Sequence, residues 1–325
     1  MGKRGPLRGS RAFWHRARAR RIAPRVRAWA APNAAGGGLQ AFPGFKAGMT
    51  RVLMIDDSES LTKGQEISRA VTIVETPPVF VYSVVFYEQT PFGLKRMGEV
   101  VAPNAPKQAR RVKPSAKKTK RIIEDFEKRA SEIACVRVLL CTQPWKAGVG
   151  NKTPQFFECA VGGKTPAEQL AAAAALLGKE VRVNDVFKEG ALADAIAVTK
   201  GYGWQGVVRR FGVSLGPRKA SKARRHGGAI GAERQAKVSY RVPRAGQTGF
   251  HRRTERAKRI MRIMHDSKEV SETGAIAHYG ALRGDYLLVE GSLPGPSKRL
   301  VVLRKPLRHF PEKKPDIKLI VKQKA

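Results

Sequence analysis

Residues 201–206 read GYGWQG and match, letter for letter, the GxGxxG spacing of a turn that cradles a dinucleotide pyrophosphate. That fingerprint also needs a strand before it, a helix after it and an acidic residue about 20 residues further on. The β-branched and basic run Val207–Phe211 predicts no helix, and Glu233 stands too late in the chain. The glycines instead favour close approach of the backbone to a bulky partner such as an RNA strand, and no nucleotide cofactor is expected.

Two further patterns could carry chemistry but lack the neighbours that the chemistry needs. Residues 163–165 read GKT, as at the end of a P-loop, yet the first glycine of that motif would fall at Glu158. The acidic pairs at 56–57 and 124–125 consist of adjacent side chains, which diverge on strands and helices. We therefore expect these carboxylates to lie on a solvated surface, and no catalytic residue is predicted from them.

The cysteines and histidines form no pattern typical of a metal site. Cys135, Cys141 and Cys159 have no CxxC spacing, and the six histidines are scattered away from them. Because zinc needs closely spaced soft ligands, we expect reduced, partly buried thiols. His226 and His251 lie in basic sequence, which suits contact with phosphate or ribose. No metal, no cofactor and no enzymatic activity are expected.

Charge sets this chain apart from an average globular protein. The 325 residues include 63 Lys and Arg against 26 Asp and Glu, a formal net charge of +37. Residues 200–259 hold 17 basic and two acidic residues, and residues 1–55 hold 12 basic residues and no acidic one. Segments of this kind attract phosphate backbones and have few apolar side chains to offset the entropy of ordering. No stretch reaches the about 20 consecutive apolar residues of a membrane span, so we expect a soluble, cytoplasmic nucleic-acid binder.

Aromatic residues are interleaved with these charges, among them Trp204, Phe211, Tyr240 and Phe250. Arginine offers bidentate donors and a stacking plane, which favours folded RNA with splayed bases. The predicted RNA-binding residues are Arg16, Arg18, Arg20, Arg21, Lys200, Gly203, Trp204, Gly206, Arg209, Arg210, Arg218, Lys219, Lys222, Arg224, Arg225, His226, Arg234, Arg244, Gly246, Gly249, His251, Arg252 and Arg253.

The elements that must position these residues are mostly strands. Short β-branched runs punctuated by Asp, Pro and Gly predict antiparallel β structure and a barrel or sandwich. The runs are 49–55, 70–75, 79–87, 99–101, 134–142, 181–187, 195–199, 275–279, 286–290 and 300–304. The turn at 291–296 is expected to join the last two runs as a hairpin.

Two helical segments interrupt the strands. Residues 115–132 carry an amphipathic stripe, and Thr165 followed by Pro166 and Glu168 forms a capping box ahead of 169–177. We therefore expect an α/β insertion over residues 103–178 within a mainly β protein.

Several blocks of sequence make the chain recognisable. It resembles the large-subunit ribosomal protein L3 (uL3) family in its archaeal and eukaryotic form. The resemblance lies in KAGMT at 46–50, TKGYGWQGV at 199–207, PRK at 217–219, IGA at 230–232, RAGQ at 244–247, HYG at 278–280 and GSLPG at 291–295.

The resemblance implies a six-stranded β-barrel of the translation-protein type with long basic extensions that penetrate 23S-type rRNA. It also implies early subunit assembly and a central loop that reaches toward the peptidyl transferase centre, with large-subunit rRNA and neighbouring ribosomal proteins as partners. Two positions depart from eukaryotic relatives: Ser221 stands where they carry a histidine that can be methylated, and Glu233 stands at their loop-tip tryptophan.

The expected organisation divides the chain into seven segments. They are an N-terminal arm (1–40), barrel segments (41–102, 179–205 and 263–310), the insertion (103–178), the central extension (206–262) and a C-terminal tail (311–325). The expected function is that of a non-catalytic constituent of the large ribosomal subunit. A free RNA-modifying enzyme and an architectural nucleic-acid-binding protein are the alternatives that the sequence leaves open.

Overall fold

The computed structural model describes residues 15–30, 38–114, 123–220, 224–233, 236–308 and 311–323. The chain packs as two compact units. Unit 1 holds residues 15–20 and the described residues of Thr199–Arg252, and unit 2 holds the described residues of Arg21–Val198 and Arg253–Ala325. No helix in these described ranges is long and apolar enough to cross a membrane.

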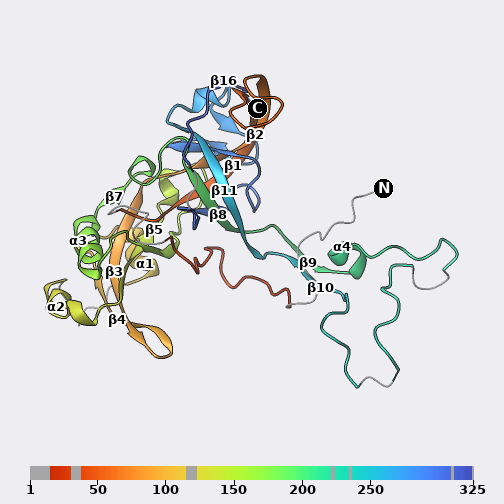
Figure 1. Cartoon of the computed structure of the whole chain (residues 1–325), viewed down its shortest axis with the longest axis horizontal. Coiled ribbons are helices and arrows are strands. Elements are labelled where there is room, and N and C mark those ends of the chain that lie inside the picture. Colours follow the sequence, from red (N-terminus) through yellow and green to blue (C-terminus); the bar gives the residue numbers. More distant parts are fainter. Residues whose placement is uncertain are drawn as a thin grey trace. The chain divides into compact units, whose positions relative to one another are not determined.

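The larger sheet of unit 2 has seven strands in the order β15-β8-β11-β14-β2-β1-β16. Figure 1 labels β1, β2, β8, β11 and β16 of this sheet. β15 also pairs with β1 in antiparallel register, from Ala41 opposite Arg304 to Phe45 opposite Leu300. The strands are β1 (Ala41–Ile55), β2 (Glu66–Glu75), β8 (Leu192–Val198), β11 (Arg252–Met264), β14 (Tyr286–Glu290), β15 (Leu300–Arg304) and β16 (Ile317–Ile320).

A second sheet is formed by strands that precede, lie within and follow the predicted insertion. Its order is β4-β3-β5-β6, with β7 paired to β3. Its strands are β3 (Val79–Thr90), β4 (Gly93–Val101), β5 (Cys135–Cys141), β6 (Phe156–Ala160) and β7 (Glu180–Val181), and β12 (Ala275–Ile276) pairs separately with β13 (Gly280–Ala281). The segment 41–102, expected to belong to the barrel, thus contributes two strands to each sheet.

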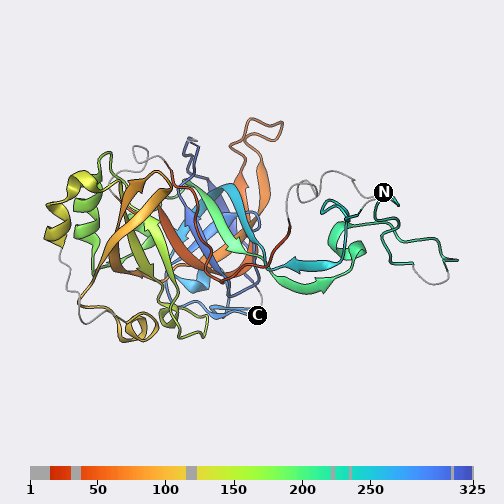
Figure 2. The same ribbon diagram turned by 90° about the horizontal axis from the view of Figure 1, so that it is seen from below.

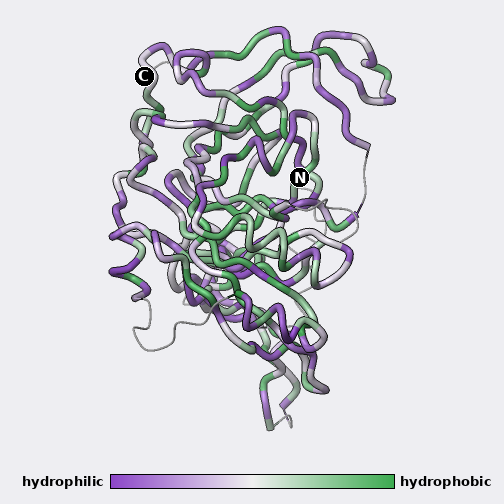
Figure 3. The backbone as a smooth tube through the Cα atoms, turned by 90° about the vertical axis from the view of Figure 1, so that its left-hand side faces the viewer, coloured by the Kyte–Doolittle hydropathy of each residue, from purple (hydrophilic) through white to green (hydrophobic). Residues whose placement is uncertain are grey.

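Side chains from both sheets share one hydrophobic cluster. Phe42 of β1, Phe86 of β3, Leu140 of β5 and Val302 of β15 are all fully buried in it. Figure 3 shows hydrophobic and hydrophilic stretches alternating along the chain. The β-branched runs therefore act as core strands, and the prediction of a mainly β protein is confirmed.

The helices are short, and α3 is the longest among the described residues. They are α1 (Lys107–Val112), α2 (Ile123–Glu127), α3 (Pro166–Leu176) and α4 (Val207–Phe211), with 3-10 turns at Ala130–Glu132, Pro144–Lys146, Val183–Asp185 and Ser267–Glu269. α3 begins as predicted: Thr165 Oγ1 accepts a hydrogen bond from the Glu168 N–H at 3.3 Å. Of the helix predicted at 115–132, residues 115–122 lie outside the described residues, and the remainder forms α2 and a 3-10 turn.

Two predicted strands are largely wrong. In the run 181–187 the Asp185 carboxylate accepts a hydrogen bond from the Arg182 N–H at 2.9 Å, which favours a turn over a strand. In the run 275–279 the strand ends at Ile276 because the chain turns: the Tyr279 N–H donates to the Ile276 carbonyl, and His278 has a φ of 62°.

The predicted hairpin at 291–296 is also wrong, because β14 and β15 do not pair with each other. β14 pairs with β11 and β2, and β15 pairs with β8 and β1. The half-buried Lys46 ammonium explains the different path: it donates to the Leu293 carbonyl at 2.6 Å and to the Gly295 carbonyl at 3.1 Å. The chain therefore crosses β1 at this turn, so that β15 pairs with β8 and β1 and not with β14.

A buried ion pair joins four segments of unit 2. Arg304 of β15 contacts the Asp194 carboxylate of β8, and the two residues are 3% and 2% exposed. Arg304 also donates to the carbonyl of Ala28 at 2.5 Å, and the second oxygen of Asp194 accepts from the Ala257 N–H at 3.0 Å. Residues 21–30 of the predicted arm are thus attached to the sheet, where Val26 joins the hydrophobic cluster.

Candidate nucleic-acid interface

Unit 1 is built on a two-stranded ladder. β9 (Gly201–Gln205) pairs antiparallel with β10 (Gly246–Gly249), and Figure 2 shows the two strands side by side with α4 following β9. The GxGxxG glycines lie within and directly after this strand instead of in a turn between a strand and a helix. This geometry differs from a dinucleotide fingerprint, in which the glycines form the turn itself.

Gly249 closes the ladder by a close approach of two backbones. It has a φ of +73°, and a Cβ built on it would lie 2.1 Å from the Lys200 carbonyl oxygen. We expect Gly249→Ala to destabilise unit 1 by roughly 2–4 kcal/mol, because left-handed backbone strain adds to the overlap. Hydrogen exchange of the Phe250 amide, which donates to the Lys200 carbonyl, measures this loss.

Gly203→Ala is the matched control for this prediction. Gly203 also has a positive φ, +66°, but a Cβ there would meet no atom within 4 Å. The control variant should therefore cost only about 1–2 kcal/mol, the backbone strain alone. Equal protection losses in the two variants would show that the close approach contributes nothing.

α4 corrects the prediction that Val207–Phe211 is not helical. Its single turn is stabilised at the C-terminal end by Gly212, which has a left-handed φ of 69° and donates its N–H to the Val208 carbonyl at 2.8 Å. The low helix propensity of the β-branched residues has only a small effect in a helix of five residues. The glycine cap and the contacts of Arg210 therefore determine the conformation.

Arg210 holds this turn against the ladder. Its Nε donates to the Gln247 carbonyl at 3.1 Å and its Nη1 to the Arg244 carbonyl at 2.9 Å. Burial lowers the pKa of this guanidinium. A Cβ on Gly246 would overlap the same guanidinium at 2.8 Å. Arg210, which was predicted as a phosphate ligand, therefore donates two of its hydrogen bonds to the protein backbone.

Cations lie over aromatic rings throughout unit 1. The Arg209 guanidinium is 5.0 Å from the Tyr202 ring centroid, and the Arg16 guanidinium is 4.9 Å from that of Phe211. Such pairs place positive charge and a flat ring at the same spot on the surface. Trp204, which is 76% exposed, adds a further ring to this surface.

The N-terminal segment of unit 1 follows the end of the ladder. The Ala19 N–H donates to the Phe250 carbonyl at 2.8 Å, and His251 Nδ1 contacts the Ala17 carbonyl at 2.9 Å. The backbone of His251 also bonds Thr199 in both directions. His251 is buried, so its contacts anchor the predicted arm to the ladder.

The predicted site residues fall into four groups. The exposed group comprises Arg18, Arg20, Arg21, Lys200, Gly203, Trp204, Gly206, Arg209, Arg218, Lys219, Arg224, Arg225, His226, Arg244 and Arg253. Arg16, Arg210 and Arg252 are half-buried, and Gly246, Gly249 and His251 are buried. Lys222 and Arg234 lie outside the described residues. Arg21 and Arg253 belong to unit 2 and the rest of these residues to unit 1.

The stretch between the two ladder strands has no core. None of the described residues from 201 to 245 is buried, and every described residue from Arg224 to Val238 is exposed. Its few backbone hydrogen bonds are local, such as the Gly216 N–H to the Arg224 carbonyl at 2.9 Å. Glu233, the single acidic residue of Thr199–Arg252, is exposed as well.

Sequence reasoning missed several residues of this surface. Tyr202 packs under Arg209, and Arg241 lies 5.8 Å from the Tyr240 ring centroid, yet neither Tyr202 nor Arg241 was predicted as a site residue. Both pairs had a sequence signal, an arginine close in sequence to an aromatic residue. Within the described ranges, no cluster of three or more His, Cys, Asp or Glu residues could hold a metal ion.

The fold and this site define a class: a mainly β protein that carries an exposed cationic segment, with little acidic charge, suited to a polyanion. The family profile described as ribosomal protein L3 matches residues 1–323. The chain belongs to the ribosomal protein L3 family.

Individual relatives cover almost the whole chain. The large ribosomal subunit protein uL3 of Methanothermobacter thermautotrophicus is 45% identical over 93% of this chain and 92% of its own. That of Methanothrix thermoacetophila is 43% identical over 98% of this chain and 97% of its own. That of Caldivirga maquilingensis is 44% identical over 93% of this chain and 90% of its own.

Proposed function

We propose that this protein is a structural constituent of the large ribosomal subunit and binds 23S-type rRNA through unit 1. One observation carries the proposal: the described residues 201–245 bury no side chain while exposing most of their cations and several rings. Such a segment gains its stability from a polyanion and not from a core. The name of the archaeal relatives, large ribosomal subunit protein, agrees with this role.

Unit 2 would supply the rigid platform. We propose that β15, β8, β11, β14, β2 and β1 form a six-stranded barrel of the translation-protein type; the pairing of β15 with both β8 and β1 supports it. The division expected from the sequence, with an arm at 1–40, an insertion at 103–178, a central extension at 206–262 and a tail at 311–325, belongs to the same proposal. The basic arms and the extension would enter rRNA.

The central extension would reach toward the peptidyl transferase centre, and the protein would join the subunit early in its assembly, next to other ribosomal proteins in the cytoplasm. No catalytic role is part of the proposal. Exposed Glu233 at the presumed tip would need a basic neighbour, a metal ion or solvent beside the phosphates.

Salt dependence tests this function. Each phosphate neutralised by Lys or Arg releases counterions, so the logarithm of the affinity for large-subunit rRNA should fall by about 0.7–0.9 per contact for each tenfold rise in salt. An affinity that stays flat from low to high salt would contradict the mechanism.

Sedimentation separates the alternatives. The native protein should remain with the large subunit after a high-salt wash, because contacts buried in the assembled particle exchange slowly. Turnover on naked RNA without subunit association would indicate a free modifying enzyme, and equal affinity for duplex DNA in competition would indicate an architectural binder.

A further inference from the structure

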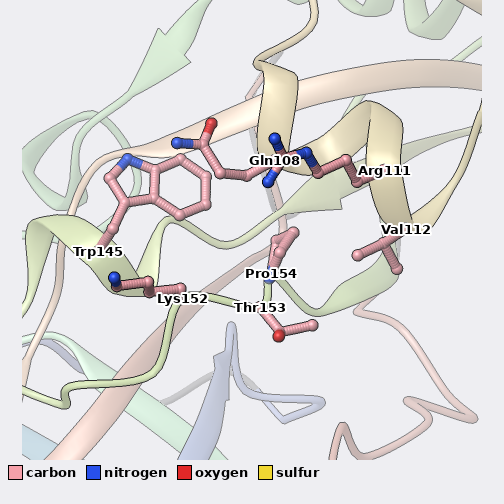
Figure 4. A pocket seen from close by; sticks show the side chains of 7 residues that line it. All are labelled: Gln108, Arg111, Val112, Trp145, Lys152, Thr153 and Pro154. Carbon is pink, nitrogen blue, oxygen red and sulfur yellow. The ribbon is translucent and has the colours of Figure 1, made fainter.

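A pocket of about 450 Å³ lies in unit 2, far along the chain from the cationic surface of unit 1 (Figure 4). Gln108, Arg111 and Val112 line it from α1, and Trp145, Lys152 and Pro154 line it from the segment between β5 and β6. Its volume falls within the roughly 300–1,000 Å³ typical of sites for small organic ligands. The pocket is therefore large enough to hold a group of that size.

The two cations of the pocket are available to a ligand. Arg111 and Lys152 are exposed, and neither forms an ion pair or side-chain hydrogen bond within the described residues. Two other cations on the same two segments differ in this respect. Lys146 pairs with Glu180 at 2.6 Å, and Arg110 donates to the Pro103 carbonyl at 2.6 Å.

The remaining lining suits a planar, hydrogen-bonding group. Figure 4 shows the Trp145 indole at the pocket with the Gln108 carboxamide at the same end. An indole face stacks on a nucleobase, and a carboxamide can both donate to and accept from a base edge. An acidic peptide would also meet the two cations and could hydrogen-bond the carboxamide, but its acidic side chains offer no flat ring to stack on the indole.

Charge around the pocket favours a polyanion over a single small anion. The described residues 107–114, which begin with α1, contain four Lys and Arg residues and no acidic residue. We propose that this pocket binds one unstacked nucleotide of an RNA strand, with the base on Trp145 and the flanking phosphates on Arg111 and Lys152. The inference rests on the proposed function, and it adds a second RNA contact outside unit 1.

Fluorine NMR of the full chain tests the pocket directly. The chain has four tryptophans, so 5-fluorotryptophan labelling gives four signals, and Trp145→Phe assigns the signal of Trp145. Titration with 5′-AMP or 5′-UMP should shift the Trp145 signal and saturate, whereas ribose 5-phosphate, which lacks the base, should not. Absence of any shift with both nucleotides, or an equal shift with ribose 5-phosphate, would overturn the inference.

Charge variants locate the phosphate contacts. Arg111→Gln or Lys152→Gln should raise the Kd for AMP roughly five- to tenfold, because each removes a charge-assisted hydrogen bond. Arg110→Gln and Lys146→Gln remove the same charge from the same two segments but outside the pocket, and they should change the Kd less than twofold. Equal effects of the two sets would overturn the assignment.

Failure of this inference can be distinguished from failure of the proposed function. In rRNA binding by the full chain, Arg111→Gln and Lys152→Gln should each reduce the size of the salt slope by about 1. A steep slope in the unmodified protein that neither variant changes would refute the pocket and leave the proposed function standing. A flat slope in the unmodified protein would refute both.

Discussion

Asp194→Ala is expected to lower the free energy of unfolding of the full chain by roughly 3–5 kcal/mol, the cost of breaking a buried ion pair by removing one partner. The variant leaves the Arg304 guanidinium, 3% exposed, without its carboxylate, and it leaves the Ala257 N–H without its acceptor. Urea-induced unfolding followed by circular dichroism measures the change.

Two further variants identify the source of this cost. Asp57→Ala removes a carboxylate that pairs with Arg259 at 2.6 Å, but the side chains of Asp57 and Arg259 are 34% and 13% exposed, so about 1 kcal/mol is expected. Replacing both buried partners, Asp194→Leu with Arg304→Met, should cost less than Asp194→Ala alone because no charge is left buried. A double variant as unstable as Asp194→Ala would show that the loss of stability comes from altered packing and not from the unpaired buried charge of Arg304.

The sequence predicted the β-rich class because β-branched runs become strands wherever a core covers them. It predicted α3 because its cap is local: Thr165 Oγ1 bonds a backbone N–H three residues away. The short helix α4 was missed, because its stability depends on Gly212 and on contacts of Arg210 with residues 34 and 37 positions away. Propensity over five residues cannot reveal contacts of that range.

Strand partners were the least predictable feature. The path from β14 to β15 depends on Lys46, nearly 250 residues earlier, whose ammonium bonds the carbonyls of the intervening turn. A local sequence pattern predicts that the chain turns at 291–296. It does not predict which strands pair with the strand before the turn and with the strand after it. The same holds for Arg304 and Ala28, which are 276 residues apart and attach the N-terminal segment to unit 2.

The exposed cationic stretch of unit 1 could be recognised in the sequence as a region, but the contacts of its individual residues could not. Charge and aromatic content are local, so the exposed stretch could be recognised from composition. The roles of individual residues could not be recognised, because they depend on contacts formed on folding. Arg210 donates hydrogen bonds to backbone carbonyls, and Gly249 lies against the Lys200 carbonyl of its own chain. Arginines in unit 1 therefore divide into those that build the surface and those left exposed on it.

Neutralising four exposed cations of unit 1 should sharply weaken rRNA binding without unfolding the protein. The variant replaces Arg218, Lys219, Arg224 and Arg225 with Gln, all of them exposed. With about 0.7–0.9 per lost phosphate contact, the salt slope of binding should shrink by about 3, and the affinity should fall most at low salt. The free energy of unfolding should change by no more than about 0.5 kcal/mol, since no buried group is touched.

A control of equal charge distinguishes location from net charge. Lys95, Arg129, Lys146 and Lys314 of unit 2 are already paired with acidic side chains at distances of 2.5–3.0 Å. Changing these four to Gln removes the same four charges, yet it should alter the salt slope by less than about 1 because paired cations release few counterions from RNA. If both sets weakened binding equally, the overall charge of +37 would govern affinity and the coreless segment would have no special role. A selective loss with the unit 1 set would mean that affinity comes from the exposed cations of the coreless segment and not from the net charge of the chain.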